Sequence, residues 1–359
     1  MTLIYVLLAI LMLAILIIVH ELGHFFAARL MHIEVTEFSV GFGPRIFGWK
    51  SRKYDTKFSV RCIPLGGFCA FYGEDDAKGE TKDDPRAFAR QNVWKRMFTV
   101  LMGPLMNFVL AFVVATMFYW IGGVETVTGV DPFISEVMAA GPAYSAGLKA
   151  GDVITEINGE NMLDGTADTL TKTIAAWKTG DAPMRMKISR GDKEIDAELT
   201  PVWDEEEQKM RIGVMVSGTY RTETRRVGFF EAAGDSAALC WNASGAILGA
   251  LKDLVTTGKG FEEAAGPVGI VSVVSTEVAS RGFSAYIELL VLISINLGLM
   301  NLLPIPGLDG SRLIFGLIEV IRGKPVPPQK EAIVHLIGMV FLFSLMIFFT
   351  FRDIIGLFR

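Results

Sequence analysis

The chain has 359 residues, of which 51% are hydrophobic and 20% are charged, and its mean hydropathy is +0.41. This composition is typical of an integral membrane protein with a water-exposed portion, and three cysteines are too few for a disulfide scaffold. The formal net charge of −5 provides no basic surface for nucleic acid, so we expect no nucleic-acid partner.

The first apolar segment, residues 1–31, predicts a transmembrane helix. No residue from Thr2 to Val19 is charged, and a helix of about 20 apolar residues crosses the hydrocarbon core. A His-Glu-x-x-His motif follows at residues 20–24. An ionisable side chain inside a span costs about 2.5–3.5 kcal/mol on insertion scales, so such residues usually serve a function. We expect the segment to be retained rather than cleaved as a signal sequence, because its first basic residue is Arg29.

The motif has the spacing of a metal site. His20 and His24 are four residues apart, so on a helix both imidazoles lie on one face and can bind one cation. Zinc suits two imidazoles and a carboxylate with a fourth position left to water, whose pKa it lowers toward about 7. Glu21 would then accept the proton of that water. The alternative, two packing histidines beside a buried glutamate, is costly inside a membrane.

Residues 32–96 are rich in lysine and arginine, which predicts a cytoplasmic segment and an outer N-terminus. Within this segment, short β-prone runs at residues 38–47 and 57–71 are interrupted by glycine and proline and are unusually apolar. We interpret them as β-hairpins that dip into the membrane, where protein or water satisfies their backbone. Cys62 and Cys69 also fall here, and their spacing favours free thiols over a metal pair.

Residues 97–121 predict the second transmembrane helix, and residues 125–216 predict a compact α/β module on the outer side. Within that module, residues 146–159 read Ala-Gly-Leu-Lys-Ala-Gly-Asp-Val-Ile-Thr-Glu-Ile-Asn-Gly and resemble the PDZ family. Residues 227–284 predict an extracytoplasmic amphipathic helix and a linker. A fifth span at residues 229–255 is the alternative, but it would bring Asp309 to the face opposite the histidines.

Residues 285–313 and 332–351 predict the third and fourth transmembrane helices. Pro304 and Pro306 interrupt the third one just before Asp309, and the freed backbone groups need a cavity or a bound peptide. An isolated aspartate at such a place more often caps a helix. Together with the histidine motif, however, Asp309 is the candidate for the third metal ligand.

Three motifs carry a resemblance that covers nearly the whole chain. His-Glu-Leu-Gly-His at residues 20–24, Gly-Pro-Leu-Met-Asn at residues 103–107 and Leu-Asp-Gly at residues 308–310 resemble the bacterial site-2 protease family of intramembrane zinc metalloproteases. The resemblance implies one Zn²⁺ bound by His20, His24 and Asp309, and Glu21 as the catalytic base. It also implies contacts to the substrate backbone or to the developing oxyanion from three further residues, Asn107, Asn296 and Asn301. For Asn296, a hydrogen bond between helices is an equal alternative.

The expected architecture is a multi-pass α-helical membrane protein with four transmembrane helices, membrane-inserted β-hairpins and one extracytoplasmic α/β PDZ domain. The charge distribution predicts that both termini lie outside and the active site lies toward the cytoplasm, and the resemblance implies a bacterial inner membrane. The resemblance implies cleavage of single-span membrane proteins, such as anti-sigma factors and signal-peptide remnants. We expect an edge strand near residues 66–72 to hold the unwound substrate. The PDZ domain would screen substrates by size or by binding a new C-terminus.

Two alternatives come from other classes of protein. One is a membrane metal-ion transporter, although a permeating ion has no use for a general base and no inverted repeat is visible in the sequence. The other is a PDZ scaffold whose metal site is not catalytic. Replacement of Glu21 by glutamine distinguishes them, because only the protease should lose its activity while it keeps its zinc.

Overall fold

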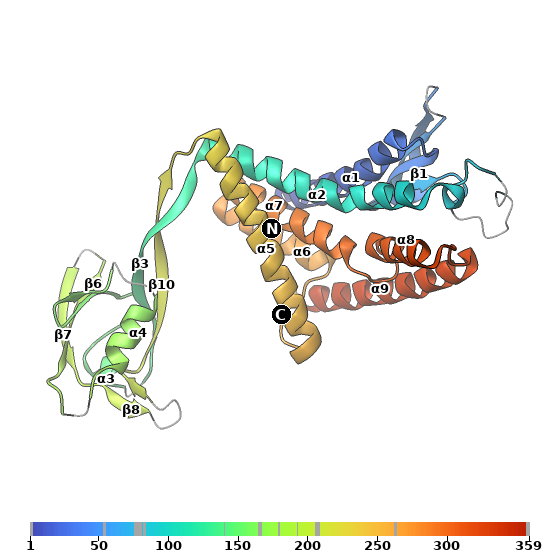
Figure 1. Cartoon of the computed structure of the whole chain (residues 1–359). Helices are drawn as coiled ribbons and strands as arrows, with labels where there is room; N and C mark the ends of the chain where they lie inside the picture. The colour runs from blue at the N-terminus through green and yellow to red at the C-terminus, as the bar shows by residue number, and fades with distance from the viewer. Residues whose placement is uncertain are drawn as a thin grey trace. The chain divides into compact units, whose positions relative to one another are not determined.

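The computed structural model describes residues 3–52, 55–74, 81, 84–139, 141–163, 167–178, 180–191, 193–204, 209–261 and 264–356. The chain divides into two compact units. The helical unit comprises Met1–Trp120 and Gly228–Arg359, and the sheet unit comprises Ile121–Val227. Figure 1 shows the elements of both units.

Four helices of the helical unit are long and apolar enough to cross a membrane. They are α1 (Leu3–Leu30), α2 (Val93–Gly122), α7 (Phe283–Leu302) and α9 (Pro328–Gly356). A helix therefore lies at each of the four predicted spans. Helices α2, α7 and α9 begin a few residues before their predicted starts, whereas α1 lies within its predicted range of 1–31. A short helix, η1 (Phe88–Arg90), precedes α2.

Glycine brings α1 and α2 into close contact. A Cβ atom on Gly23 would lie 2.2 Å from the carbonyl oxygen of Met102, and one on Gly103 would lie 2.2 Å from Nε2 of His24. Small residues allow membrane helices to approach at this distance. Gly23 therefore lets α1 approach the backbone of α2, and Gly103 makes room for the His24 ring.

The segment between these two helices forms a β-hairpin that folds over itself. Its strands, β1 (Val35–Lys50) and β2 (Lys57–Phe71), pair as an antiparallel sheet. Residues 57–60 pair with both 37–40 and 47–50, and residues 37–40 pair in turn with 67–70. Among the described residues, segment 67–70 therefore has a neighbour on one side only, which makes it an edge.

The third predicted span, 285–313, is divided in the structure. Helix α7 ends at Leu302, and a separate helix, α8 (Asp309–Arg322), begins at the predicted ligand. The break follows from Pro304 and Pro306, which cannot continue the hydrogen-bonding pattern of α7. The predicted short connection between the third and fourth spans is therefore largely helical.

Residues 227–284, predicted as one amphipathic helix and a linker, form two helices. Helix α5 (Phe229–Thr257) is not among the four candidate spans, and it packs against α2 and α7 through Leu239, Cys240, Ala243 and Ile247. Helix α6 (Pro267–Arg281) buries Val274 and Val278 in a cluster with Met12 and Leu16 of α1. The expected linker is thus partly a packed helix.

The sheet unit contains a six-stranded sheet in the order β10-β3-β4-β6-β7, with β5 paired to β4. Its strands are β3 (Val124–Val137), β4 (Val153–Ile157), β5 (Glu160–Asn161), β6 (Met184–Arg190), β7 (Lys193–Leu199) and β10 (Val214–Arg225). The remaining elements are α3 (Pro142–Ser145), α4 (Ala167–Ala175), β8 (Val202–Asp204) and β9 (Lys209–Arg211). Ile134, Ile154 and Ile188 lie in its core. This arrangement agrees with the predicted compact α/β module.

Candidate metal centre

Three side chains from opposite ends of the chain converge in the helical unit. Nε2 of His20 lies 3.1 Å and Nε2 of His24 lies 3.3 Å from Oδ2 of Asp309, and the two Nε2 atoms lie 3.2 Å apart. With zinc–ligand bonds of about 2.0–2.1 Å, tetrahedral ligands lie about 3.3 Å from one another. The three atoms therefore have the spacing that one zinc ion requires. Among the described residues, this is the metal-ligating cluster that the structure contains.

The His24 ring is oriented by the backbone of α2. Its Nδ1 lies 3.0 Å from the carbonyl oxygen of Thr99, which only accepts hydrogen bonds. The proton therefore sits on Nδ1, and the lone pair of Nε2 is left for a metal ion. This is the tautomer that binds a metal ion.

Asp309 reaches the histidines because the chain turns sharply between α7 and α8. A Cβ atom on Gly310 would lie 2.2 Å from the Leu303 carbonyl oxygen, so the start of α8 lies against the end of α7. Asp309 is the first residue of α8, and its carboxylate faces the histidines. The predicted alternative, an aspartate whose side chain caps a helix, does not describe this geometry.

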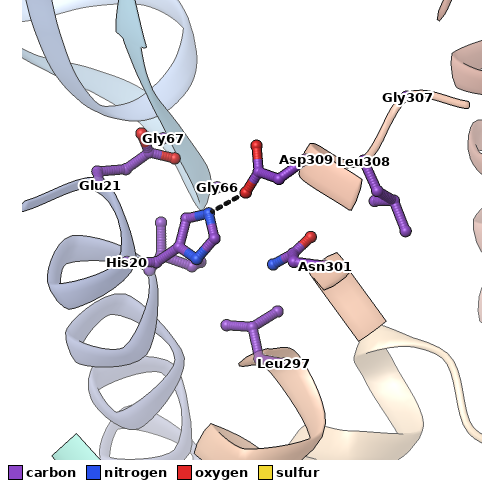
Figure 2. Close-up of a pocket in the computed structure, with 10 residues that line it drawn as sticks. His20, Glu21, Gly66, Gly67, Leu297, Asn301, Gly307, Leu308 and Asp309 are labelled. Atoms are coloured by element: carbon purple, nitrogen blue, oxygen red, sulfur yellow. Dashed lines mark ion pairs between the residues drawn. The ribbon is translucent and has the colours of Figure 1, made fainter. Parts of the chain in front are cut away.

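A cavity of about 230 Å³ opens beside the three side chains. His20, Glu21 and Asp309 line it together with Leu297 and Asn301, and Figure 2 shows His20, Asp309 and Asn301 directed toward the same space. At about 30 Å³ per molecule, several waters fit in this volume. The cavity therefore gives water access to His20, Asp309 and the Glu21 carboxylate.

The edge segment of the hairpin forms one wall of this cavity. Gly66 and Gly67 line it, and a Cβ atom on Gly67 would lie 3.2 Å from Cγ of Glu21 and 2.8 Å from the Ser39 carbonyl oxygen. A larger residue at position 67 would displace the glutamate. Gly67 was not among the predicted site residues, and the Gly66-Gly67 pair in an apolar strand was the signal that could have identified it.

The structure separates the three asparagines that sequence analysis groups together. Asn301 lines the cavity, whereas Asn107 is fully buried with its Nδ2 3.4 Å from Nδ1 of His20. Asn296 is exposed and is not among the residues that line the cavity. Leu297 and Asn301 are four residues apart and share a face of α7, while Asn296 is turned about 100° away. The structure therefore gives no support to the predicted role of Asn296 at this site.

Comparisons with known proteins agree with this geometry. The model of peptidase family M50 matches residues 8–345. The regulator of sigma-W protease RasP of Bacillus subtilis is 31% identical to this chain, with 96% of each chain covered. A putative zinc metalloprotease of Clostridium acetobutylicum is 33% identical, with 98% of this chain and 97% of the relative covered. A PDZ domain of an SdrC-like protein from Listeria innocua, a solved structure, is 26% identical over 24% of this chain and 92% of its own, with a TM-score of 0.22.

The family match covers both histidines, Glu21 and Asp309, and it extends over most of the described helical unit. Zinc is the metal that the name of the Clostridium acetobutylicum relative specifies, and it is the metal whose spacing the three ligand atoms fit. The chain belongs to peptidase family M50, the site-2 protease family, and is a zinc metalloendopeptidase.

Proposed function

We propose that this zinc metalloendopeptidase cleaves the transmembrane segments of single-span membrane proteins, including anti-sigma factors. One observation carries the proposal: the ligand atom of Asp309 meets those of His20 and His24, which lie on a 28-residue apolar helix, beside a cavity that holds several water molecules. A site on such a helix is accessible to peptide bonds within the membrane. The RasP relative is named a regulator of a sigma factor, which supports the substrate class.

His20, His24 and Asp309 would hold the zinc ion. When bound, zinc lowers the pKa of a water molecule toward about 7 and polarises the carbonyl under attack. Glu21 lines the same cavity and is positioned to take the proton from that water and pass it to the leaving amine. Asn301, on the opposite wall, can donate its amide hydrogens to the carbonyl oxygen of the substrate.

Asn107 has a different role in this proposal. Because it is fully buried against His20, it is positioned to orient the His20 ring rather than to contact a substrate. In the orientation given, its Oδ1 has no hydrogen-bond partner among the described residues. A half-turn of the amide brings Oδ1 to Nδ1 of His20, where it accepts the ring proton and leaves the Nε2 lone pair for zinc.

The substrate would be held as an extended strand against residues 67–70. Gly67, at the start of this edge segment, lines the cavity. Among the described residues the segment is paired on one side only, so main-chain hydrogen bonds can join its other side to an unwound peptide. Several large apolar side chains at the far end of the hairpin are exposed, namely Phe42, Ile46, Phe47, Trp49 and Ile63. Such exposure is favourable in lipid, which supports insertion of the hairpin into the membrane.

The proposed topology has the predicted PDZ domain outside and the α8–α9 connection inside the cell. In a cysteine-free background, a membrane-impermeant thiol reagent should label Lys193→Cys in intact cells. Lys324→Cys should react only after permeabilisation. Both positions are exposed. Labelling of Lys324→Cys in intact cells would show that the α8–α9 connection lies outside and would contradict the proposed orientation.

Glu21→Gln tests the proposed chemistry. The amide cannot accept a proton, so cleavage of a single-span substrate by the purified full chain should fall at least about a hundredfold. Zinc should remain bound at one ion per chain, because all three ligands are intact. Glu136→Gln, at an exposed position of β3, is the control and should cleave at the wild-type rate.

The same variant distinguishes the protease hypothesis from the two alternative functions. A metal-ion transporter or a PDZ scaffold would keep its activity after Glu21→Gln, since neither needs a general base. Full peptide cleavage by Glu21→Gln, or a wild-type protein without zinc, would refute the proposal. Membrane fragments that accumulate in cells carrying Glu21→Gln would identify the substrates.

A further inference from the structure

The fourth span, α9, supplies no residue to the metal-ligating cluster found among the described residues. It nevertheless contacts the turn that carries Asp309. We propose that α9 is part of the metal centre, because His335 and Gly338 hold residues 303–308 in the conformation that presents Asp309 to the histidines. This inference rests on the proposed ligand role of Asp309.

The first contact is between two backbones. A Cβ atom on Gly338 would lie 2.0 Å from the carbonyl oxygen of Pro306 and 2.3 Å from its carbonyl carbon. Neither atom belongs to a flexible side chain, so any larger residue at position 338 must push the turn away from α9. Gly338 therefore sets how closely the turn approaches the helix.

The second contact is on the neighbouring residue of the turn. Gly307 has a φ of +97°, and a Cβ atom there would lie 3.2 Å from the backbone nitrogen of Met339. Only glycine adopts this φ without strain, and only glycine leaves space for α9 at this point. Pro306 and Gly307 thus pack directly against the backbone of one turn of α9, at Gly338 and Met339.

The third contact is a hydrogen bond from the turn to α9. The backbone N–H of Gly307 donates to Nδ1 of His335 at 3.3 Å. Nδ1 must therefore be the unprotonated nitrogen, and the ring proton lies on Nε2, which is 3.7 Å from Oε1 of Glu331. His335 belongs to none of the motifs in the sequence. Its partner is a backbone amide that no sequence pattern reveals.

These contacts matter because Asp309 follows Gly307 by two residues. Its Oδ2 must lie close to the two Nε2 atoms at once, and the observed distances are 3.1 and 3.3 Å. If the turn moved by the width of one methyl group, this displacement would be large compared with these distances. Loss of residues that orient a metal ligand typically lowers metal affinity about 10–100-fold. His335 and Gly338 are therefore positioning residues for the third ligand.

Zinc affinity of the purified full chain tests the inference, measured by competition with a chromophoric chelator. His335→Leu removes the acceptor and should lower zinc affinity about tenfold. His335→Asn places Oδ1 near the former Nδ1 and should stay within about threefold of the wild type. A merely structural role for the ring would not be rescued by asparagine.

Glycine variants provide a matched pair on the same helix. Gly338→Ala should lower zinc affinity at least about tenfold. Gly356→Ala is the control and should bind zinc like the wild type, because nothing lies within 4 Å of a Cβ atom at that position. Size-exclusion chromatography and thermal unfolding report whether each variant is folded. If Gly338→Ala does not fold, the comparison of His335→Leu with His335→Asn decides.

The outcomes separate this inference from the ligand assignment. Asp309→Ala should lose zinc, and retention of zinc in that variant would overturn both. Loss of zinc in Asp309→Ala together with wild-type affinity in His335→Leu would overturn the role of α9 alone. Equal losses in His335→Leu and His335→Asn would also overturn it, since the acceptor at Nδ1 would then be irrelevant.

Discussion

Asn107 illustrates how a single buried side chain can determine the state of a metal ligand. It lies beside Nδ1 of His20, and its side chain is 0% exposed. Asn107→Leu has a similar shape but no acceptor for the ring proton, which would then be free to move to Nε2 and block zinc binding. We expect zinc affinity to fall about 10–100-fold in this variant. Competition with a chelator measures the change.

Asn107→Asp is the matched control, because a carboxylate also accepts the Nδ1 proton and carboxylate–histidine–zinc arrangements are common. Its zinc affinity should stay within about tenfold of that of the wild type. If Asn107→Leu binds zinc normally but cleaves slowly, Asn107 acts on the substrate, as the family resemblance first implied.

At this scale, the sequence was most informative where chemistry depends on spacing along one helix. His20 and His24 could be predicted because four residues bring two imidazoles onto one face. The Thr99 carbonyl could not be predicted, since every residue carries one and only the packing of α1 against α2 selects it. Asn296 was grouped with Asn301 through the family resemblance, but the two residues lie on different faces of α7.

The edge segment 67–70 is the element on which substrate selection depends in the proposed mechanism. If a substrate pairs with it as a strand, contacts must alternate with a period of two residues. In a Glu21→Gln background without native cysteines, Phe68→Cys should form disulfides with every second position of a substrate cysteine series. Mass spectrometry or gel mobility identifies the cross-linked species.

Phe47→Cys is the control for this experiment, because residues 47–50 form the other edge of the same folded hairpin. It should give no such pattern. Cross-links at consecutive substrate positions would indicate a helical or disordered substrate instead. A uniform absence of cross-links from Phe68→Cys, with zinc and folding intact, would contradict strand pairing.

Element types were predictable, but their pairings were not. The apolar lengths predicted four helices, and glycine and proline predicted strands in residues 38–71. Residues 37–40 pair with two segments of β2, so the chain must reverse between residues 60 and 67, and the local sequence pattern carries no signal of this reversal. Likewise, the two prolines predicted a break before Asp309. The sequence predicted only a connection between the third and fourth spans, whereas the structure has the helix α8 there.

The molecule consists of two units, each with its own hydrophobic core. The core of the sheet unit is formed by its own strands, and the metal centre lies wholly within the helical unit. The PDZ resemblance predicted an independent module at residues 125–216, and the sheet unit comprises Ile121–Val227. An independent module should lose stability without disturbing zinc binding, and one buried carboxylate provides a way to test this.

Asp152, in the sheet unit, is fully buried before β4. Burial alone would raise the pKa of its carboxyl. Two hydrogen bonds from Arg190, at 2.6 and 2.8 Å, and one from the Lys149 amide outweigh that effect and lower it. Because the folded pKa lies below the unfolded value of about 3.9, the ionised carboxylate stabilises the folded unit above that pH. This stabilisation is lost as the pH falls through the folded pKa.

Arg190→Gln should therefore destabilise the sheet unit by about 1–2 kcal/mol at neutral pH. It should also make the free energy of unfolding of this unit less dependent on pH below about 4. The control is Arg185→Gln on the same strand, an 82% exposed side chain that is 3.8 Å from Glu198, whose loss should change stability by less than about 0.5 kcal/mol. Amide exchange of β4 and β6 in the full chain, corrected for intrinsic rates, measures both. Zinc affinity should be unchanged in either variant, because no ligand belongs to this unit. A loss of zinc that accompanies the opening of β4 would mean that the sheet unit supports the metal centre directly.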